Sequence, residues 1–288
     1  IKKRKAKQSS INKSEMPALP DPEVTEGAPY NILIAGIGGT GVSTAGAIIG
    51  MAAHIEGRHV KALDQTGLAQ KFGAVHSHIR VGNNQEEVHG GRIPLGATDL
   101  LIASDLIVAT GDDALEKLSK NRTNAVVNSH EEMPASFISN RDIEYGKDTM
   151  LSILDSTCLK GKLSACDASG ITAALLGDSI TANLFLLGVA SQNGLLPVSA
   201  SAIEKALEIN GVAIESNSAA FMWGRYAAIE PEIISKHTEP FNTKEPIAGD
   251  LREIISIREK FLVEYQNSKY AERYREGVER VKKVEEGV

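Results

Sequence analysis

The chain has 288 residues, of which 42% are hydrophobic and 24% are charged, and its formal net charge is −6. This balance is typical of a globular protein with a sizeable core, in one large α/β domain or two smaller ones. A net negative chain lacks the basic face that phosphate contacts need, which argues against nucleic acid as the main partner. The only two cysteines, Cys158 and Cys166, can supply neither a disulfide framework nor a four-thiolate cluster.

The first 29 residues are rich in Lys and Pro. Residues 1–29 hold a basic run from Lys2 to Lys7, followed by Pro17, Pro20 and Pro22. Basic runs can bind nucleic acid or acidic lipid, but this composition favours a solvated, extended linker or tail. The sequence has no apolar run of about 20 residues and no signal peptide, so we expect a cytoplasmic protein without a membrane partner. Its first residue is Ile1 rather than Met, which is compatible with a fragment of a longer protein.

The strongest local motif is a glycine loop between an apolar run, Ile32–Ala35, and a segment rich in Ala and Gly, Val42–Ala53. The spacing Gly-x-Gly-x-x-Gly predicts a strand, a tight turn and a helix that together bind a nucleotide. Glycines let the backbone approach a ligand, and unpaired amides at a helix start attract an anion. A tight turn without a ligand is the alternative. The candidate contacts for a phosphate are Gly36, Gly38, Gly39, Thr40 and Gly41.

The residues after the loop indicate whether the site could bind a dinucleotide. His59–Leu63 predicts a second strand, and Asp64 at its end has a spacing suited to the ribose of NAD. However, Gln65–Gly73 is polar and does not predict the crossover helix that such a site requires. Ala74–Val81 then alternates with period two, which predicts a strand with His76, His78 and Arg80 on one face. Two histidines without a third ligand do not predict zinc, so we expect polar surface there.

Four blocks in a fixed order carry a family resemblance. They are the glycine loop Gly36–Gly41, the segment Gly67–Arg80, the segment Leu176–Gly188, and Asn210–Asn217 with Ala220–Arg225. Together they resemble the gamma-type domain of 2-oxoacid:ferredoxin oxidoreductases, most of all the C-terminal part of the fused indolepyruvate:ferredoxin oxidoreductase. The resemblance covers about Tyr30 to Ala228, and more weakly Leu251 to Val284.

The resemblance implies an activity for the whole enzyme. Enzymes of this family oxidise a 2-oxoacid with coenzyme A to an acyl-CoA, use thiamine diphosphate and iron–sulfur clusters, and reduce ferredoxin. Thiamine sites usually show Gly-Asp-Gly followed by Asn-Asn, and Gly111-Asp112 and Gly177-Asp178 do not match this pattern. Thiamine diphosphate and the iron–sulfur clusters are therefore expected elsewhere in the complete enzyme. This chain would provide no catalytic or metal-ligating residue, and alone it would be inactive.

The resemblance implies that this chain helps to form the coenzyme A side of the enzyme. In relatives the gamma-type domain lies beside the coenzyme A path, so the glycine loop and nearby polar residues could contact a phosphate or carboxylate. Beyond the loop, the candidate residues are Asp64, Lys71 and Arg80. The implied partners are other domains or subunits of the oxidoreductase, ferredoxin indirectly, and a second copy of the chain.

The remaining segments complete the expected fold. Short apolar runs predict strands at Leu100–Ala103, Leu106–Ala109 and Ala125–Asn128, and a helix opens at Asp112. From Thr149 onward only helices are expected. We predict a Rossmann-like, mostly parallel sheet with flanking helices, followed by a helical C-terminal portion.

The helical portion suggests both a boundary and an interface. Asp178 and either Ser199 or Ser201 are predicted caps, Gly211 is a predicted stop, and Ile209 is expected to face inward. Aromatic, amide and guanidinium groups are frequent at interfaces, so we predict a partner surface on this portion. Its residues are Asn183, Phe185, Phe221, Trp223 and Arg225.

The domain boundaries follow from these segments. Residues 30–230 form the gamma-type domain, 231–250 a linker, and 251–288 an amphipathic helix or hairpin with one apolar stripe. Two other functions stay open. One is a dehydrogenase domain that binds NAD(P) through Asp64, and the other is a non-catalytic assembly module whose glycine loop is empty.

Overall fold

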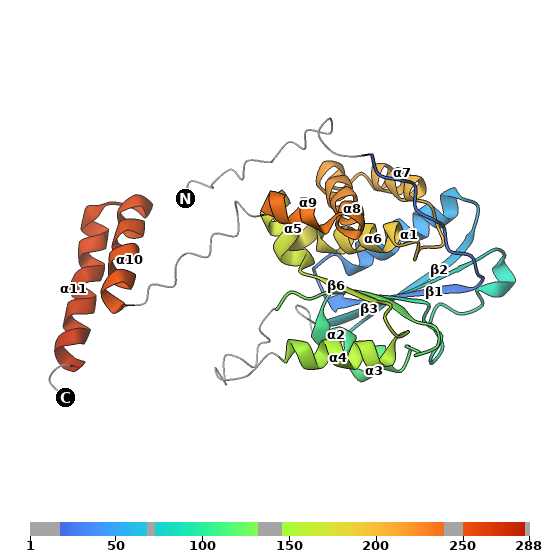
Figure 1. Ribbon diagram of the computed structural model, residues 1–288, viewed down its shortest axis with the longest axis horizontal. Coiled ribbons are helices and arrows are strands. Elements are labelled where there is room, and N and C mark those ends of the chain that lie inside the picture. Colours follow the sequence, from blue (N-terminus) through green and yellow to red (C-terminus); the bar gives the residue numbers. More distant parts are fainter. Residues whose placement is uncertain (1–17, 68–72, 132–145, 239–249, 286–288) are drawn as a thin grey trace. The chain divides into compact units, whose positions relative to one another are not determined.

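The computed structural model describes residues 18–67, 73–131, 146–238 and 250–285 (Figure 1). Contacts divide the chain into two units. We call described residues 18–238 the body and residues 250–285 the hairpin, and each is described by itself.

The body is built on a six-stranded mixed sheet in the order β2-β3-β1-β4-β5-β6. Strand β1 pairs in parallel with β4, β4 with β5, and β5 with β6. Strand β3 runs antiparallel to both of its neighbours, β1 and β2. The predicted mostly parallel sheet is confirmed, with one reversed strand inside it. The strands are β1 (Tyr30–Ile37), β2 (His59–Thr66), β3 (Ala74–Gly82), β4 (Leu100–Ala103), β5 (Asn124–Asn128) and β6 (Leu163–Cys166).

Helices cover both faces of this sheet (Figure 1). Consecutive residues of β1 point to opposite faces, so Ile32 and Ile34 join one hydrophobic core while Leu33 and Ala35 join the other. This explains the continuous apolar run of the strand. One layer holds α1 (Val42–Ile55), α5 (Ala168–Leu176), α6 (Ala182–Gln192), α7 (Ala200–Asn210), α8 (Ile214–Ile229) and α9 (Pro231–Thr238). The other holds α2 (Leu106–Ala109), α3 (Asp112–Leu115) and α4 (Lys147–Thr157).

Helices α6 and α8 touch along their backbones. A Cβ atom at Gly188 would meet the carbonyl oxygen of Phe221, and one at Gly224 would meet that of Phe185. Only glycine permits this approach, and it brings large aromatic side chains into the core. The predicted partner surface is therefore wrong: its five residues are buried inside the body, with exposed fractions of 2, 0, 0, 1 and 6% for Asn183, Phe185, Phe221, Trp223 and Arg225.

Four further expectations need correction or limits. Leu106–Ala109 is helix α2 rather than a strand, because the Asp105 side chain caps it by accepting a hydrogen bond from the Val108 amide at 2.8 Å. Strand β6, just after Thr149–Thr157, was not expected. Ile209 is 55% exposed rather than inward. Ser199, not Ser201, caps α7, and Gly211 ends it as predicted.

The two predicted linkers lie only partly within the described residues. Near the beginning, the Thr25 amide donates to the Leu196 carbonyl at 2.9 Å, and Arg225 donates to the Pro20 carbonyl at 3.1 Å. Residues 18–29 thus contact the helical layer. Within the predicted linker 231–250, Pro231–Thr238 forms α9, and Ile234 is buried. Residues 1–17 and 239–249 lie outside the described part.

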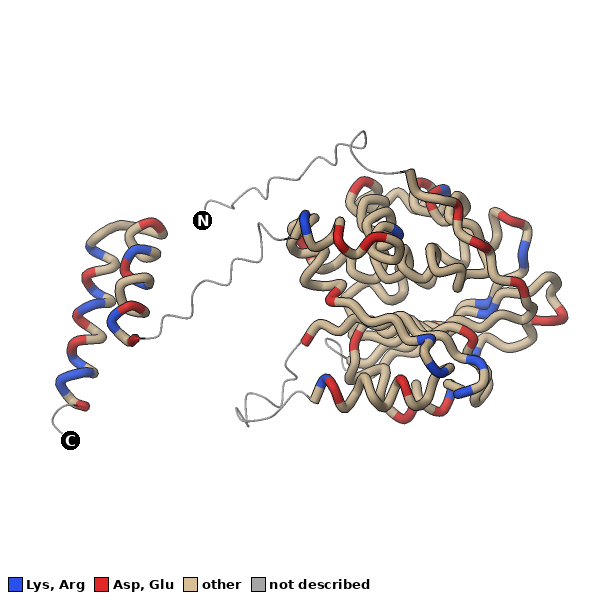
Figure 2. The backbone as a smooth tube through the Cα atoms, in the orientation of Figure 1, with Lys and Arg blue, Asp and Glu red and all other residues tan. Residues whose placement is uncertain are grey.

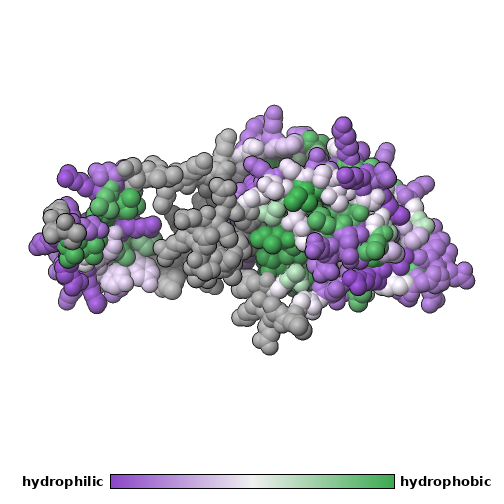
Figure 3. All heavy atoms as spheres, turned by 90° about the horizontal axis from the view of Figure 1, so that it is seen from below, coloured by the Kyte–Doolittle hydropathy of each residue, from purple (hydrophilic) through white to green (hydrophobic). Residues whose placement is uncertain are grey.

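The body also contains two short 3-10 helices, η1 (Gln85–Glu87) and η3 (Ser179–Thr181). The hairpin consists of α10 (Leu251–Tyr265) and α11 (Ser268–Glu285). Glu259 accepts two hydrogen bonds from Arg275, at 2.6 and 2.7 Å. Charges of both signs alternate along both helices (Figure 2). Hydrophobic residues nevertheless reach the surface, as Figure 3 shows, and Phe261 and Val281 are 56% and 59% exposed. Of the two predicted alternatives, a single helix or a hairpin, the structure has the hairpin, with hydrophobic residues exposed on it.

Candidate functional site

The glycine loop leaves β1 and enters α1 through a fixed turn. The Gly38 amide donates to the Gly73 carbonyl at 2.8 Å, and the Thr40 side chain donates to the Ile37 carbonyl at 2.8 Å. Gly39 and Gly41 have positive φ angles of 92° and 94°, which L-residues rarely adopt. Gly38 is not among the positive-φ glycines. Backbone freedom in this loop is therefore needed at Gly39 and Gly41.

One side chain from the helical layer holds the loop in place. Asn183, on α6, is 2% exposed and donates from Nδ2 to the Thr40 carbonyl at 2.7 Å. Its Oδ1 accepts a hydrogen bond from Ser104 Oγ, just past the end of β4. A single amide thus ties the loop to the neighbouring strand and to α6. Within the loop, the Thr40 carbonyl is therefore occupied by Asn183, and the Gly38 and Thr40 amides are occupied by the Gly73 and Ile37 carbonyls.

A first cavity, of about 250 Å³, opens beside the loop at the carboxyl ends of the parallel strands. Ser104, Asn128 and His130 contribute from the ends of β4 and β5. Asn128 donates to Ser169 Oγ at 2.9 Å, and His130 Nδ1 lies 2.9 Å from Asp167 Oδ1. Ligands of open α/β sheets bind at this end of the strands. Asp105 and Asp178 line this cavity, whereas no Lys or Arg does so among the described residues, so the lining favours a hydrogen-bond donor over an anion.

A second cavity, of about 380 Å³, also borders the loop. Gly38, Gly39 and Gly41 form one wall together with Ser43 and Thr44, in the first turn of α1. The first-turn amides of a helix have no acceptor within the helix and carry its positive dipole end. Gly39 lines both cavities. An anion in the second cavity would meet the start of α1, which is the geometry that the glycine spacing predicts.

Asp64 is not placed as a dinucleotide site requires. It is an exposed residue inside β2, and its Oδ1 accepts a hydrogen bond from Ser77 Oγ of β3 at 2.6 Å. In a dinucleotide fold the second strand lies next to the first, but here the antiparallel β3 separates β2 from β1. The NAD(P) alternative therefore lacks its expected strand order.

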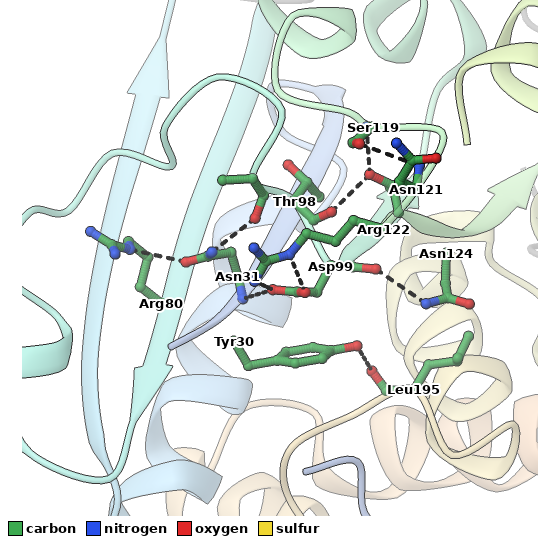
Figure 4. A network of polar contacts seen from close by, with 12 residues as sticks. Tyr30, Asn31, Arg80, Thr98, Asp99, Ser119, Asn121, Arg122, Asn124 and Leu195 are labelled. Carbon is green, nitrogen blue, oxygen red and sulfur yellow. Dashed lines mark hydrogen bonds and ion pairs between the residues drawn. The ribbon is translucent and has the colours of Figure 1, made fainter. Parts of the chain in front are cut away.

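Arg80 lies away from the glycine loop. Because β3 is antiparallel to β1, Val75 is level with Gly36 while Arg80 is level with Asn31 at the beginning of β1. Arg80 donates from Nε to Asn31 Oδ1 at 3.0 Å (Figure 4). This network also joins Asn31 to Asp99, which pairs with Arg122. The structure thus gives Arg80 a place in a polar network at the opposite end of the strand, and Lys71 lies outside the described residues.

His76 and His78 are buried, with exposed fractions of 7% and 1%, so the expectation of polar surface is wrong. Burial, together with the nearby charges of His76, Arg92 and Lys117, lowers the pKa of His78 to about 4. Burial also lowers the pKa of His76. The helices and loops after β3 cover this face, which the alternation of the strand could not reveal. No group of three or more possible metal ligands occurs in the described ranges.

Several site residues were not singled out from the sequence. Ser104 and Asn128 stand at the ends of two apolar strand runs, a position that marks the ligand edge of a parallel sheet. Asn183 was seen only as an interface candidate, since its contact with Thr40 joins residues 143 positions apart. Helices long and apolar enough to cross a membrane are absent from the described part of the chain.

Together these features define an α/β domain with a glycine loop between β1 and α1 and two cavities beside it. Comparison with known proteins gives the family. The model of the pyruvate ferredoxin/flavodoxin oxidoreductase family matches residues 31–227, and the chain belongs to this family. A second model, described only as a family of unknown function, matches residues 251–287.

Characterised relatives agree with this assignment. The indolepyruvate oxidoreductase subunit IorB of Thermococcus kodakarensis is 30% identical over 205 residues, which are 70% of this chain and 96% of that subunit. The IorB subunit of Pyrococcus horikoshii is 28% identical over 204 residues, again 70% of this chain and 96% of the relative. The resemblance to gamma-type domains of 2-oxoacid oxidoreductases is thereby confirmed.

A solved structure shows the same fold. The 2-oxoglutarate:ferredoxin oxidoreductase of Magnetococcus marinus, solved with 2-oxoglutarate, coenzyme A and succinyl-CoA bound, matches with a TM-score of 0.51 at 17% identity. The match covers 70% of this chain and 31% of that one. The domain architecture described above is therefore shared with one part of a larger oxidoreductase chain.

Proposed function

We propose that this chain is the gamma-type part of an oxidoreductase that converts a 2-oxoacid to an acyl-CoA and reduces ferredoxin. The proposed 2-oxoacid is indolepyruvate or another aryl pyruvate. Thiamine diphosphate and iron–sulfur clusters belong to other parts of that enzyme. The family and the two IorB relatives support the reaction class.

The role proposed for this chain is to contact coenzyme A. The observation that carries it is the second cavity, which Gly38, Gly39 and Gly41 line together with the start of α1. The first-turn amides of that helix have no acceptor within the helix. Backbone amides at a helix start bind phosphate groups without a charged side chain. Other subunits are the expected partners, with ferredoxin reached through them, and a second copy of the chain remains a prediction.

The test compares two glycines in the complete enzyme. Gly39→Val puts a branched side chain at φ 92° on a residue that lines both cavities. Gly57→Val is the matched control, because Gly57 also has a positive φ, of 72°, and open surroundings, but follows the far end of α1.

The readout is the rate of viologen reduction at increasing coenzyme A concentration. We expect Gly39→Val to raise the KM for coenzyme A at least about tenfold, since it blocks the approach of an anion to the loop. Gly57→Val should leave this KM unchanged. Equal KM values in both variants would refute a coenzyme A contact and would favour an assembly module with an empty loop.

A further inference from the structure

The turn between α7 and α8 exposes large aliphatic side chains. Ile209, Val212 and Ile214 are 55%, 62% and 39% exposed. Ile180, on η3, is 56% exposed, and it lines the second cavity together with Val212. We call these four residues the apolar patch. Exposed apolar residues that gather in one place mark an interaction surface rather than ordinary free surface.

The backbone of this turn is held in one conformation. Ala213 adopts φ 45° and is the only non-glycine residue with positive φ in the described ranges. A residue with a Cβ rarely keeps such a conformation, and backbone strain of this kind concentrates at functional sites. Asn217 Nδ2 donates to the Val212 carbonyl at 2.9 Å, and Ser216 Oγ donates to the Ala213 carbonyl at 3.0 Å. The exposed side chains are thus presented in advance, which lowers the entropic cost of covering them.

The charges around the apolar patch are mainly negative. Residues 178–181 and 205–216 contain three carboxylates and one basic residue, Lys205, whose Nζ lies 3.2 Å from Glu208 Oε2. The three acidic residues are all exposed, and they are Asp178, Glu208 and Glu215.

This charge pattern decides between two kinds of partner. Two identical copies that met at this patch would bring the same residues together and place acid against acid. Like charges across an interface are unfavourable. The apolar patch therefore fits a different protein surface, which is apolar at its centre and has Lys or Arg at its rim.

The position of the apolar patch indicates where that surface belongs. Ile180 and Val212 line the second cavity, and Gly38, Gly39 and Gly41 of the glycine loop line it too. A surface that covered the patch would therefore also border this cavity. Under the proposed function, the acyl group that coenzyme A accepts is formed on another part of the enzyme, so that part must approach the same cavity.

We propose that the apolar patch is the docking surface for the part of the oxidoreductase that forms the acyl group, through an apolar contact with a basic rim. The identity of this partner rests on the proposed function. The patch differs from the interface expected from the sequence, whose residues are buried, and it includes Ile209, which was expected to face inward.

Hydrogen exchange tests whether the patch is covered. The amides of Ile214, Glu215 and Ser216 lie in the first turn of α8 and have no acceptor within the helix. They should exchange fast in this chain alone. In the complete enzyme without coenzyme A, we expect their exchange to be at least about tenfold slower, because covered amides lose access to water.

Two matched substitutions locate the contact. Ile209→Asp places a carboxylate in the last turn of α7, inside the patch but outside both cavities, and should remove most of the slowing. Ile55→Asp is the control, because Ile55 is 41% exposed and lies in the last turn of α1. That turn is beside the opposite end of α7, where the Ser199 amide donates to Glu56 Oε1 at 3.0 Å. Ile55→Asp should leave the slowing unchanged, and both variants should unfold at the urea midpoint of the parent.

A second pair of variants tests the charge of the partner. Glu215→Gln removes the carboxylate, and Glu215→Lys also adds a positive charge. We expect Glu215→Lys to reduce the slowing more than Glu215→Gln does at low salt, with a smaller difference at high salt. Equal slowing in the two variants at low salt overturns the basic rim and with it the proposed partner.

The remaining outcomes separate the docking surface from the proposed function. Unchanged exchange in the complete enzyme, or an equal effect of Ile55→Asp and Ile209→Asp, overturns the docking surface. Slowing in this chain alone at high concentration assigns the patch to a second copy, and slowing that requires coenzyme A assigns it to the ligand; both overturn the proposal. Slowing as predicted, with a coenzyme A KM that Gly39→Val leaves unchanged, supports docking and overturns the coenzyme A contact.

Discussion

The contact between α6 and α8 makes a strong prediction about stability. Gly224→Ala places a methyl group against the Phe185 carbonyl, with the Cα of Gly188 only 3.1 Å away. Both obstacles are backbone atoms, so they cannot rotate aside as a flexible side chain would. The two helices must move apart, and this loosens the packing of Phe185 and Phe221, which are fully buried.

The magnitude follows from two opposing effects. Replacing glycine with alanine inside a helix gains about 1 kcal/mol of helix propensity. Overpacking a close contact costs typically about 1–3 kcal/mol, and more where the neighbours cannot adjust. Since the obstacles are carbonyl and Cα atoms, we expect a net loss of about 2 kcal/mol. For a domain of this size that corresponds to a decrease in Tm of roughly 4–8 °C.

The assay is urea unfolding followed by the fluorescence of Trp223, the only tryptophan of the chain. Gly50→Ala is the matched control, because Gly50 lies inside α1 and a Cβ there meets only Val60 Cγ2, at 3.9 Å. That variant should be as stable as the parent or more stable by up to about 1 kcal/mol. If Gly224→Ala were as stable as Gly50→Ala, the backbone contact between α6 and α8 would be refuted.

Three further predictions concern the buried groups. The pKa of His78 is lowered from 6.5 to about 4, so as the pH falls the unfolded chain binds a proton at this residue before the folded chain does. The free energy of unfolding should therefore decrease by about 2 kcal/mol between pH 7 and pH 5. Unfolding curves of His78→Gln should show a smaller decrease. Trp223 should resist acrylamide quenching in the native chain, because it is 1% exposed; strong quenching would contradict its place in the core. Burial raises the pKa of the Cys158 and Cys166 thiols to about 12, so neither is a ready thiolate. Two cysteines cannot supply a four-thiolate cluster, so the isolated chain should be colourless and should not reduce viologen with an oxoacid and coenzyme A.

Local patterns predicted the ligand edge better than its surroundings. The apolar run of β1, the glycine spacing and the Ala-rich α1 are neighbours in sequence, and their structure depends mainly on one another. The alternation of β3 was also evident. Its direction was not, because strand pairing depends on distant residues, and this is why Arg80 was expected near the loop although it lies level with Asn31.

Two short segments show why composition alone is ambiguous. Leu106–Ala109 has the apolar, β-branched character of a buried strand, yet the side chain of Asp105 makes it a helix by capping its amides. Asp105, directly before this run, is the N-cap signal that favours a helix. Leu163–Cys166 mixes large, small and polar residues, and it becomes strand β6 only because β5 offers it an open edge.

The helical half demonstrates a different limit. Aromatic and guanidinium side chains were expected at a partner surface, but glycines at 188 and 224 bring α6 and α8 so close that Phe185, Phe221 and Trp223 fill the body instead. The residue types therefore suggested a partner interface, but the close packing of the two helices places these side chains in the core. The spacing of two glycines on facing helices was the signal that could have shown this.

The buried helical half also explains how the site is held. Because α6 is fixed against α8, Asn183 on α6 can hold the Thr40 carbonyl, and Thr181 just before α6 stays beside the start of α8. The glycine loop thus receives its shape from residues that are distant in sequence but rigidly packed in the fold. Amides that are fixed in advance need no reorganisation when an anion binds, which favours affinity without a charged side chain. The packing of α6 on α8 therefore links the stability of the body to the geometry of its ligand edge.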